Sequence, residues 1–214
     1  MAKTRSTESL RRYTDLPALL HMLKHRNITL LDPASWDDTN DSYYLLKYKE
    51  KKNLKSVLAL CLTEAEETYH HWRIFSHGSA GVCISFHRVN LIAALQSQTG
   101  VVVKDVQYRK VREARKRIET PKLSDLPFLK RYAFIAEEEV RAVYESSDKA
   151  VKFLDVPIDL RSVLRITLSP WIHDRLKTAT KDAIYAIPGC SGLDVRRSTL
   201  IGNAEWKKLG DEAA

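Results

Sequence analysis

The pattern of apolar and polar positions predicts short strands interrupted by helices. Apolar residues recur at near-helical spacing from Leu16 to Leu23, which favours a helix there. Continuous or alternating apolar runs predict strands at residues 10–14, 27–31, 56–64, 81–87, 99–108, 139–146, 156–170 and 183–189. Helical spacing returns at residues 43–55, 64–77, 90–98 and 171–183. This pattern is typical of the α+β class, with seven or eight strands.

Two segments are harder to assign from periodicity. Residues 32–44, "DPASWDDTNDSYY", are dense in Asp, Asn and Ser and predict a loop. Residues 109–139 predict one or two helices, with a proline-marked break between Thr120 and Pro127. No repeat or linker is visible, so we expect a single domain over residues 1–214.

The composition gives the chain a net positive charge. The 214 residues include 35 Lys and Arg against 27 Asp and Glu, a formal net charge of +8. Such a surplus favours polyanions, and one basic stretch is suited to contact phosphates. The candidate nucleic-acid-binding residues are Arg109, Lys110, Arg112, Arg115, Lys116 and Arg117. An exposed basic helix without a ligand would show the same pattern.

The chain shows no apolar run of membrane-spanning length and no signal-peptide pattern, so we expect a soluble, cytoplasmic protein. Its three cysteines are widely spaced and lack zinc-binding spacing. Phosphate-binding loops and the common serine or zinc hydrolase motifs are also absent from the sequence. We predict no metal site, with one alternative left open: a nuclease in which Asp37, Asp38, Asp41 and the glutamates near residue 138 bind magnesium.

The segment "AEEEVRAVYE", residues 136–145, carries the most suggestive carboxylates. If it forms a strand, Glu137 and Glu139 lie on one face together with Arg141. Two carboxylates beside a guanidinium can hold one acid ionised and keep another poised for proton transfer. The alternative is a solvated helix end stabilised by Glu–Arg spacing.

Several short motifs occur in an order that resembles a known bacterial family. They are "RRYT", "LLDPASWDDTND", "CLTE", "HWRIFSHGSAGVCISF" and "KRYAFIAEEEVR". Together they resemble the family catalogued as domain of unknown function twenty-nine seventy-one, over about Arg12 to Arg141. The chain departs from that family's pattern at Trp36, Asp37, Thr39 and Phe75, the last of which replaces a tyrosine.

The same order is more loosely similar to the ADP-ribosyltransferase superfamily. This resemblance implies a split mixed or antiparallel sheet with flanking helices, and NAD as a substrate. It further implies that Arg12, Tyr13 and Thr14 contact the NAD phosphates or ribose and that Trp72, Phe75 and Ser76 flank the nicotinamide. Glu139 would be the catalytic carboxylate and Glu137 the first acid of the Glu-x-Glu pair.

Two functional hypotheses follow. The first is an ADP-ribosyltransferase-like toxin or phage-defence effector that cleaves NAD and transfers ADP-ribose to a macromolecule; the acceptor could be RNA, DNA or a protein. The second is a non-enzymatic basic module that binds nucleic acid or protein in a phage-defence or toxin–antitoxin operon. In either setting the resemblance implies an antitoxin protein as a partner.

Overall fold

We describe the protein from a computed structural model that covers residues 8–76, 78–116 and 120–213. The chain divides into two compact units, each assembled from separate segments. Unit 1 contains the described residues up to Leu10, Asn27–Ala65 and His87–Ile158, and unit 2 contains Arg11–Arg26, Glu66–Phe86 and the described residues from Asp159 onward. Within these ranges, no helix combines the length and the apolar character needed to cross a bilayer. That residues 1–214 act as a single domain stays a prediction.

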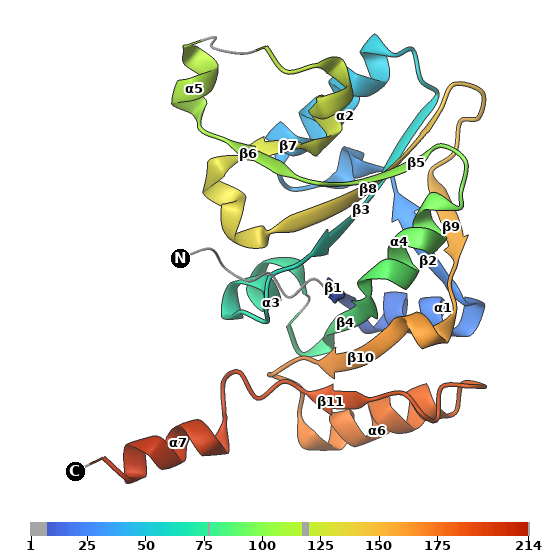
Figure 1. Cartoon of the computed structure of the whole chain (residues 1–214). Helices are drawn as coiled ribbons and strands as arrows, with labels where there is room; N and C mark the ends of the chain where they lie inside the picture. The colour runs from blue at the N-terminus through green and yellow to red at the C-terminus, as the bar shows by residue number, and fades with distance from the viewer. Residues whose placement is uncertain (1–7, 77, 117–119, 214) are drawn as a thin grey trace. The chain divides into compact units, whose positions relative to one another are not determined.

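Unit 1 is built on antiparallel strands in the order β9, β2, β3, β8, β5 (Figure 1). Their bounds are β2 Asn27–Leu31, β3 Ser56–Thr63, β5 Val101–Asp105, β8 Glu139–Ser146 and β9 Phe153–Pro157. β8 pairs with β3 along its whole length, so Glu139 lies opposite Thr63 and Arg141 opposite Cys61. Strand β5 pairs with the other edge of β8, and the first five residues of β8, Glu139–Val143, are buried.

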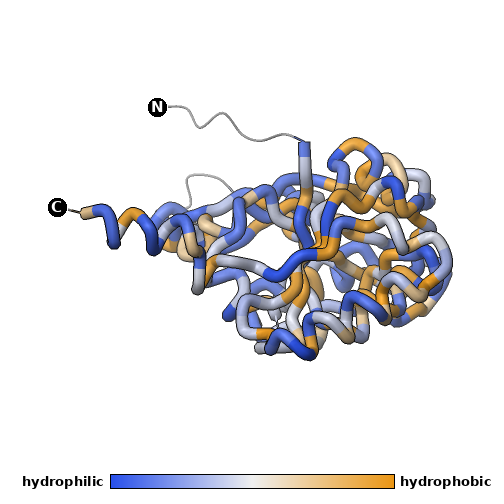
Figure 2. The backbone as a smooth tube through the Cα atoms, turned by 90° about the horizontal axis from the view of Figure 1, so that it is seen from below, coloured by the Kyte–Doolittle hydropathy of each residue, from blue (hydrophilic) through white to orange (hydrophobic). Residues whose placement is uncertain are grey.

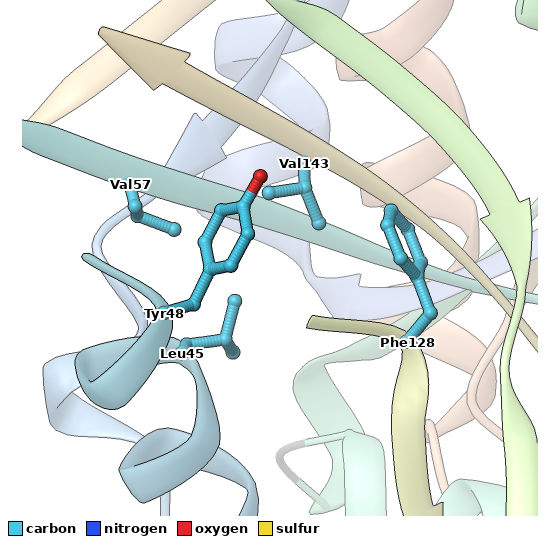
Figure 3. Packing of buried hydrophobic residues seen from close by; sticks show 5 residues of the cluster. All are labelled: Leu45, Tyr48, Val57, Phe128 and Val143. Atoms are coloured by element: carbon cyan, nitrogen blue, oxygen red, sulfur yellow. The ribbon is translucent and has the colours of Figure 1, made fainter. Parts of the chain in front are cut away.

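Helix α2 (Thr39–Lys51) begins inside the segment that the sequence predicted to be a loop. Asp38 explains this early start, because its carboxylate accepts hydrogen bonds from the N–H groups of Asn40 and Asp41 and so caps the helix. Leu45 and Tyr48 then face the sheet and pack with Val57, Val143 and Phe128 (Figure 3). This cluster holds α2 against β3, β8 and the turn η3 (Leu123–Phe128).

The described part of residues 109–139, which was predicted to form one or two helices, is helical only in short pieces. It contains the short helix α5 (Val111–Arg115), the 3₁₀ turns η3 and η4 (Tyr132–Glu137), and β7 (Leu129–Arg131). β7 pairs in parallel with β6 (Gln107–Arg109), which splits from β5 where the Val106 N–H donates to the Glu139 carbonyl. Pro127 has no N–H to donate, which disfavours a continuous α-helix. Helix α4 (Arg88–Gln96) completes the unit.

Unit 2 has its own strands, in the order β11, β10, β4, β1, with β10 antiparallel to β4 and parallel to β11. Ser9 and Leu10 of β1 are assigned to unit 1 and its other residues to unit 2. The bounds are β1 Ser9–Asp15, α1 Leu16–His25, α3 Tyr69–Phe75, β4 Gly81–His87, β10 Val163–Leu168, α6 Asp174–Tyr185, β11 Val195–Arg197 and α7 Ala204–Asp211. The helix α7 has no buried residue and is mostly hydrophilic (Figure 2).

The α+β class is confirmed, with flanking helices and eleven strands in the described ranges rather than the seven or eight expected. The strand predicted at residues 183–189 was wrong. Ala183–Tyr185 form the last turn of α6, and the segment then turns at Gly189, whose φ of 78° is left-handed. The apolar residue Ile184 belongs to the buried face of that helix, and a short apolar run could not distinguish the two structures.

Candidate functional site

The glutamate triplet straddles the start of β8. Glu137 ends η4, Glu138 adopts a left-handed conformation with φ of 41°, and Glu139 is the first residue of the strand. The turn at Glu138 brings its two neighbours to one cation: Lys130 Nζ lies 2.5 Å from Glu137 Oε2 and 3.2 Å from Glu139 Oε2. The expected convergence of Glu137 and Glu139 therefore occurs in unit 1, around an ammonium group.

Arg141 is the centre of this cluster and is fully buried. Its guanidinium donates to Glu139 through Nε at 2.7 Å and Nη2 at 3.0 Å. On its other side it donates to Asp41 of α2 through Nη1 at 2.8 Å and Nη2 at 2.6 Å. A fifth hydrogen bond, 2.8 Å long, reaches the carbonyl of Pro127, and the group lies 5.1 Å from the ring centroid of Trp36. Two paired carboxylates thus share one planar guanidinium.

The charges around the two glutamates shift their pKa values in opposite directions. Burial disfavours the charged form of Glu139, but the attraction of Arg141, reinforced by its hydrogen bonds, prevails and lowers the pKa of Glu139 to about 2. For Glu137, burial outweighs the attraction of Lys130 and raises the pKa. Burial also acts against the charge of Lys130, yet the carboxylates of Glu139 and Glu137 raise the pKa of this amine above its ordinary value. One acid is fixed as a carboxylate while its neighbour binds a proton more readily.

A cleft of about 1160 Å³ lies next to this cluster in unit 1. Asp41 and Lys130 belong to both the cluster and the cleft wall. The other lining residues come from the start of α2, from β6 and α5, and from β7: Asp38, Thr39, Asn40, Tyr43, Tyr44, Arg109, Lys110, Val111, Glu113, Thr120, Pro121, Leu129 and Arg131. The acidic cluster and an open, partly basic cleft are therefore contiguous.

The basic residues predicted to bind nucleic acid divide into three groups. Arg109 and Lys110 line the cleft. Arg112, Arg115 and Lys116 are exposed on α5 and the turn after it. Arg117 lies outside the described residues. Their role in nucleic-acid binding stays a prediction.

The residues predicted to contact NAD gather in unit 2. Tyr13 of β1 stacks on His71 with 5.4 Å between ring centroids and meets the Trp72 ring edge-on at 5.2 Å. Trp72 is fully buried, and its Nε1 donates to Glu67 at 2.7 Å. Phe75 lies 5.9 Å from His71 and is 37% exposed. Phe75 is therefore the more exposed of the two predicted nicotinamide-flanking rings, whereas Trp72 is buried; their contact with nicotinamide stays a prediction.

Three predicted residues complete this region. The hydroxyl of Ser76 donates to the Trp72 carbonyl and so closes the end of α3. Arg12 and Thr14 lie on either side of Tyr13 in β1 and are partly buried. Since Glu139 belongs to unit 1 and these residues to unit 2, the prediction that they share one pocket stays a prediction.

Sequence reasoning missed Asp41 as the partner of Arg141, and it missed Lys130 altogether. The signal for Asp41 was its spacing with Leu45 and Tyr48, which puts an acid on the buried face of α2. The magnesium alternative has little support, because Asp41 is taken by Arg141 and Asp38 caps α2. Among the described residues, no group of three or more His, Cys, Asp or Glu is arranged to hold a metal ion.

No protein-family model matches the chain, and no curated protein matches its sequence. Among solved structures, the chain is similar to Thermus sp. 2.9 DarT in complex with NAD+, with 10% identity, a TM-score of 0.45, and 90% of this chain and 96% of that chain covered. Thermus sp. 2.9 DarT in complex with ADP-ribosylated ssDNA gives 9% identity, a TM-score of 0.44, and coverage of 90% and 94%. Likeness of this strength carries no functional argument for this chain.

Proposed function

We propose that the protein is an ADP-ribosyltransferase that cleaves NAD and transfers ADP-ribose to a macromolecule, with nucleic acid as the acceptor. The observation that supports this proposal is that two neighbouring carboxylates have pKa values shifted in opposite directions. Glu139 is held ionised by Arg141, while the pKa of Glu137 is raised by burial. Acids separated in this way can take different roles in one reaction.

Cleavage of NAD requires one group that stabilises positive charge and another that accepts a proton, and the two glutamates can take these roles. When the bond between C1′ of the ribose and the nicotinamide nitrogen breaks, its electron pair leaves with nicotinamide and positive charge develops on the sugar. A fixed carboxylate stabilises that charge, and it does so most strongly where water is excluded. Glu139 is 4% exposed and is oriented by Arg141, which meets both conditions. As an acceptor atom bonds to C1′, its proton passes to a base, and the raised pKa of Glu137 suits that role.

The remaining parts of the proposal follow from the resemblance and from charge. Arg12, Tyr13 and Thr14 are assigned to the phosphates or ribose of NAD, and Trp72, Phe75 and Ser76 to the nicotinamide. The surplus of cations favours a polyanionic acceptor. A toxin or phage-defence role in the cytoplasm, opposed by an antitoxin protein, completes the assignment.

The test measures nicotinamide release from labelled NAD, with single-stranded and duplex oligonucleotides supplied as acceptors. We expect release by the wild-type protein and its loss in Glu139→Gln. Glu138→Gln is the matched control: it removes the same charge one residue away, and we expect it to retain release. Circular dichroism and thermal melting check that each variant is folded. Absence of release by the folded wild-type protein, or undiminished release by Glu139→Gln, contradicts the proposal.

A second candidate is a non-enzymatic nucleic-acid-binding module. It is favoured by the completeness of the ion pairs, since both carboxylate oxygens of Glu139 and of Asp41 are already bound by Arg141. In this case the glutamates serve only the fold. Thermal melting with and without NAD separates the candidates, because a ligand that binds the native state raises the melting temperature. No NAD-dependent shift and no nicotinamide release would favour the module.

A further inference from the structure

Helix α1 of unit 2 (Figure 1) carries two exposed histidines, His21 and His25. They are four residues apart, a spacing that brings side chains together on one face of a helix. The two imidazole rings lie with 4.6 Å between their centroids and with planes tilted by 42°. The buried residues of α1 are Leu19, Met22 and Leu23, so packing in the core accounts for neither ring.

The nitrogens of both imidazoles are available to a ligand from solvent. Within the described ranges, neither imidazole takes part in a hydrogen bond or an ion pair, and each ring contacts the other. The neighbouring Arg26 binds elsewhere, because its guanidinium donates to the Pro188 carbonyl and, at 3.5 Å, to Cys190 Sγ. The pair is therefore not explained by contacts with the rest of unit 2.

The helix fixes the separation of the two histidines before any ligand binds. Asp15 caps the first turn by accepting the Ala18 N–H at 2.8 Å, and at the other end the Arg26 N–H donates to the Met22 carbonyl. His25 is the last residue of α1, where the helix carbonyls create a partial negative charge that favours a cation. Lys24 would repel a cation, but it is exposed and its charge is screened by solvent.

The stretch "HMLKH", residues 21–25, has the histidine spacing of the HExxH helix of metalloproteases, in which both histidines bind one zinc ion from the same helix face. Met22 replaces the glutamate that acts as a base in those enzymes, so the pair can hold an ion without activating water. Imidazole suits Zn²⁺, Ni²⁺ and Cu²⁺, whereas Mg²⁺ prefers oxygen ligands. The prediction of no metal site rested on the cysteine spacing and on the absence of the complete motif, and it did not consider this pair.

We infer that His21 and His25 form a binding site for a divalent ion of the zinc, nickel and copper class. One nitrogen of each imidazole ligates the ion at about 2.0–2.1 Å, and water completes the coordination because both rings are exposed. Only the folded helix holds the two ligands together, so binding stabilises the folded state of α1. The inference is independent of the proposed function, which assigns no residue of α1 to NAD cleavage.

Isothermal titration calorimetry tests the site with ZnCl₂, NiCl₂ and MgCl₂, on the full chain without a polyhistidine tag. The pH is about 7.5, above the ordinary histidine pKa of about 6.5. We expect one Zn²⁺ or Ni²⁺ ion per chain and no binding of Mg²⁺. At a Ni²⁺ concentration about 100 times the Kd, the temperature of unfolding should rise by about 5–10 °C. Absence of Zn²⁺ and Ni²⁺ binding, or Mg²⁺ binding of equal affinity, overturns the inference.

Single variants test each ligand. His21→Ala and His25→Ala should each weaken Ni²⁺ binding about ten-fold or more, since even the loss of a hydrogen-bonding partner behind a metal ligand costs that much. Both variants should stay folded, because alanine is favourable at an exposed helix position. His70→Ala is the matched control: His70 is an exposed histidine of α3 whose neighbour His71 is buried, and its loss should leave binding unchanged. Cys61→Ser removes an exposed thiol and should also leave binding unchanged.

The pattern across the variants decides the inference, whatever the nicotinamide assay shows. A loss confined to His21→Ala and His25→Ala supports the site. Unchanged affinity in either of these variants overturns it, and so does a loss of binding in Cys61→Ser, which would make the thiol the ligand. Circular dichroism of each variant ensures that the comparison is made between folded proteins.

Discussion

The Asp41–Arg141 pair offers the sharpest test of the structure. Asp41→Asn keeps the shape of the side chain but removes its charge, and the amide cannot accept from both Nη1 and Nη2. The side chains of the pair are 2% and 0% exposed, so water cannot replace the lost acceptor. The guanidinium would keep Glu139 and the Pro127 carbonyl as partners, which leaves it only partly satisfied.

The magnitude follows from the burial of the pair. Removing one partner of a buried ion pair costs about 3–5 kcal/mol, because the other charge stays in the interior without its counterion. An exposed pair on the same helix is the control: Lys47 and Glu50 are 2.6 Å apart but 36% and 49% exposed. Pairs of that kind contribute about 0–1 kcal/mol, so Glu50→Gln should have little effect.

Urea denaturation followed by circular dichroism measures both variants. We expect the free energy of unfolding to fall by about 3–5 kcal/mol in Asp41→Asn and by less than about 1 kcal/mol in Glu50→Gln. A loss below about 1 kcal/mol in Asp41→Asn would mean that Arg141 finds other partners or remains hydrated, which would refute the buried pair.

Three further predictions concern the same unit. As the pH falls from about 4.5, the ordinary pKa of a glutamate, to about 2, the protein should lose about 3 kcal/mol of stability from Glu139, because its folded pKa is lowered and the unfolded state binds the proton first; pH-dependent urea titrations should show a correspondingly smaller loss in Glu139→Gln. Leu45→Ala, in the cluster of Figure 3, should cost about 2–5 kcal/mol by leaving a cavity, as measured by urea denaturation. Asp38→Ala should cost about 1 kcal/mol by removing the cap of α2, visible as a lower midpoint of thermal unfolding.

The long elements of the chain were predictable because their sequences carry their own periodicity. Strand β3 is a run of apolar residues, β8 carries Val140, Ala142, Val143 and Tyr144 between polar residues, and α6 keeps helical spacing. Residues 106–116 and 120–138 were not predictable in the same way. Their short strands and 3₁₀ turns are fixed by distant partners, as when Val106 bonds to Glu139, and no local pattern encodes such a contact.

In the candidate site too, contacts between residues close in sequence were predictable and contacts between distant residues were not. Alternation along β8 correctly predicted that Glu139 and Arg141 are neighbours, because they lie two residues apart on one strand. Asp41 lies 100 residues from Arg141, and Lys130 meets both Glu137 and Glu139 because the left-handed turn at Glu138 places these two acids side by side. Residue types alone suggested an acidic site, but the fold determined which cations accompany it.

Arg141 connects the acid proposed for NAD cleavage to helix α2. Its guanidinium binds Glu139 on one side and Asp41 on the other, so it orients the acid assigned to NAD cleavage and fixes the first turn of α2. That turn leads directly into Tyr43 and Tyr44, which line the cleft. The two carboxylates accept four of the five hydrogen bonds of this buried guanidinium, and the Pro127 carbonyl accepts the fifth. Asp41→Asn should therefore weaken nicotinamide release, because Arg141 loses one of the two carboxylates that hold it beside Glu139.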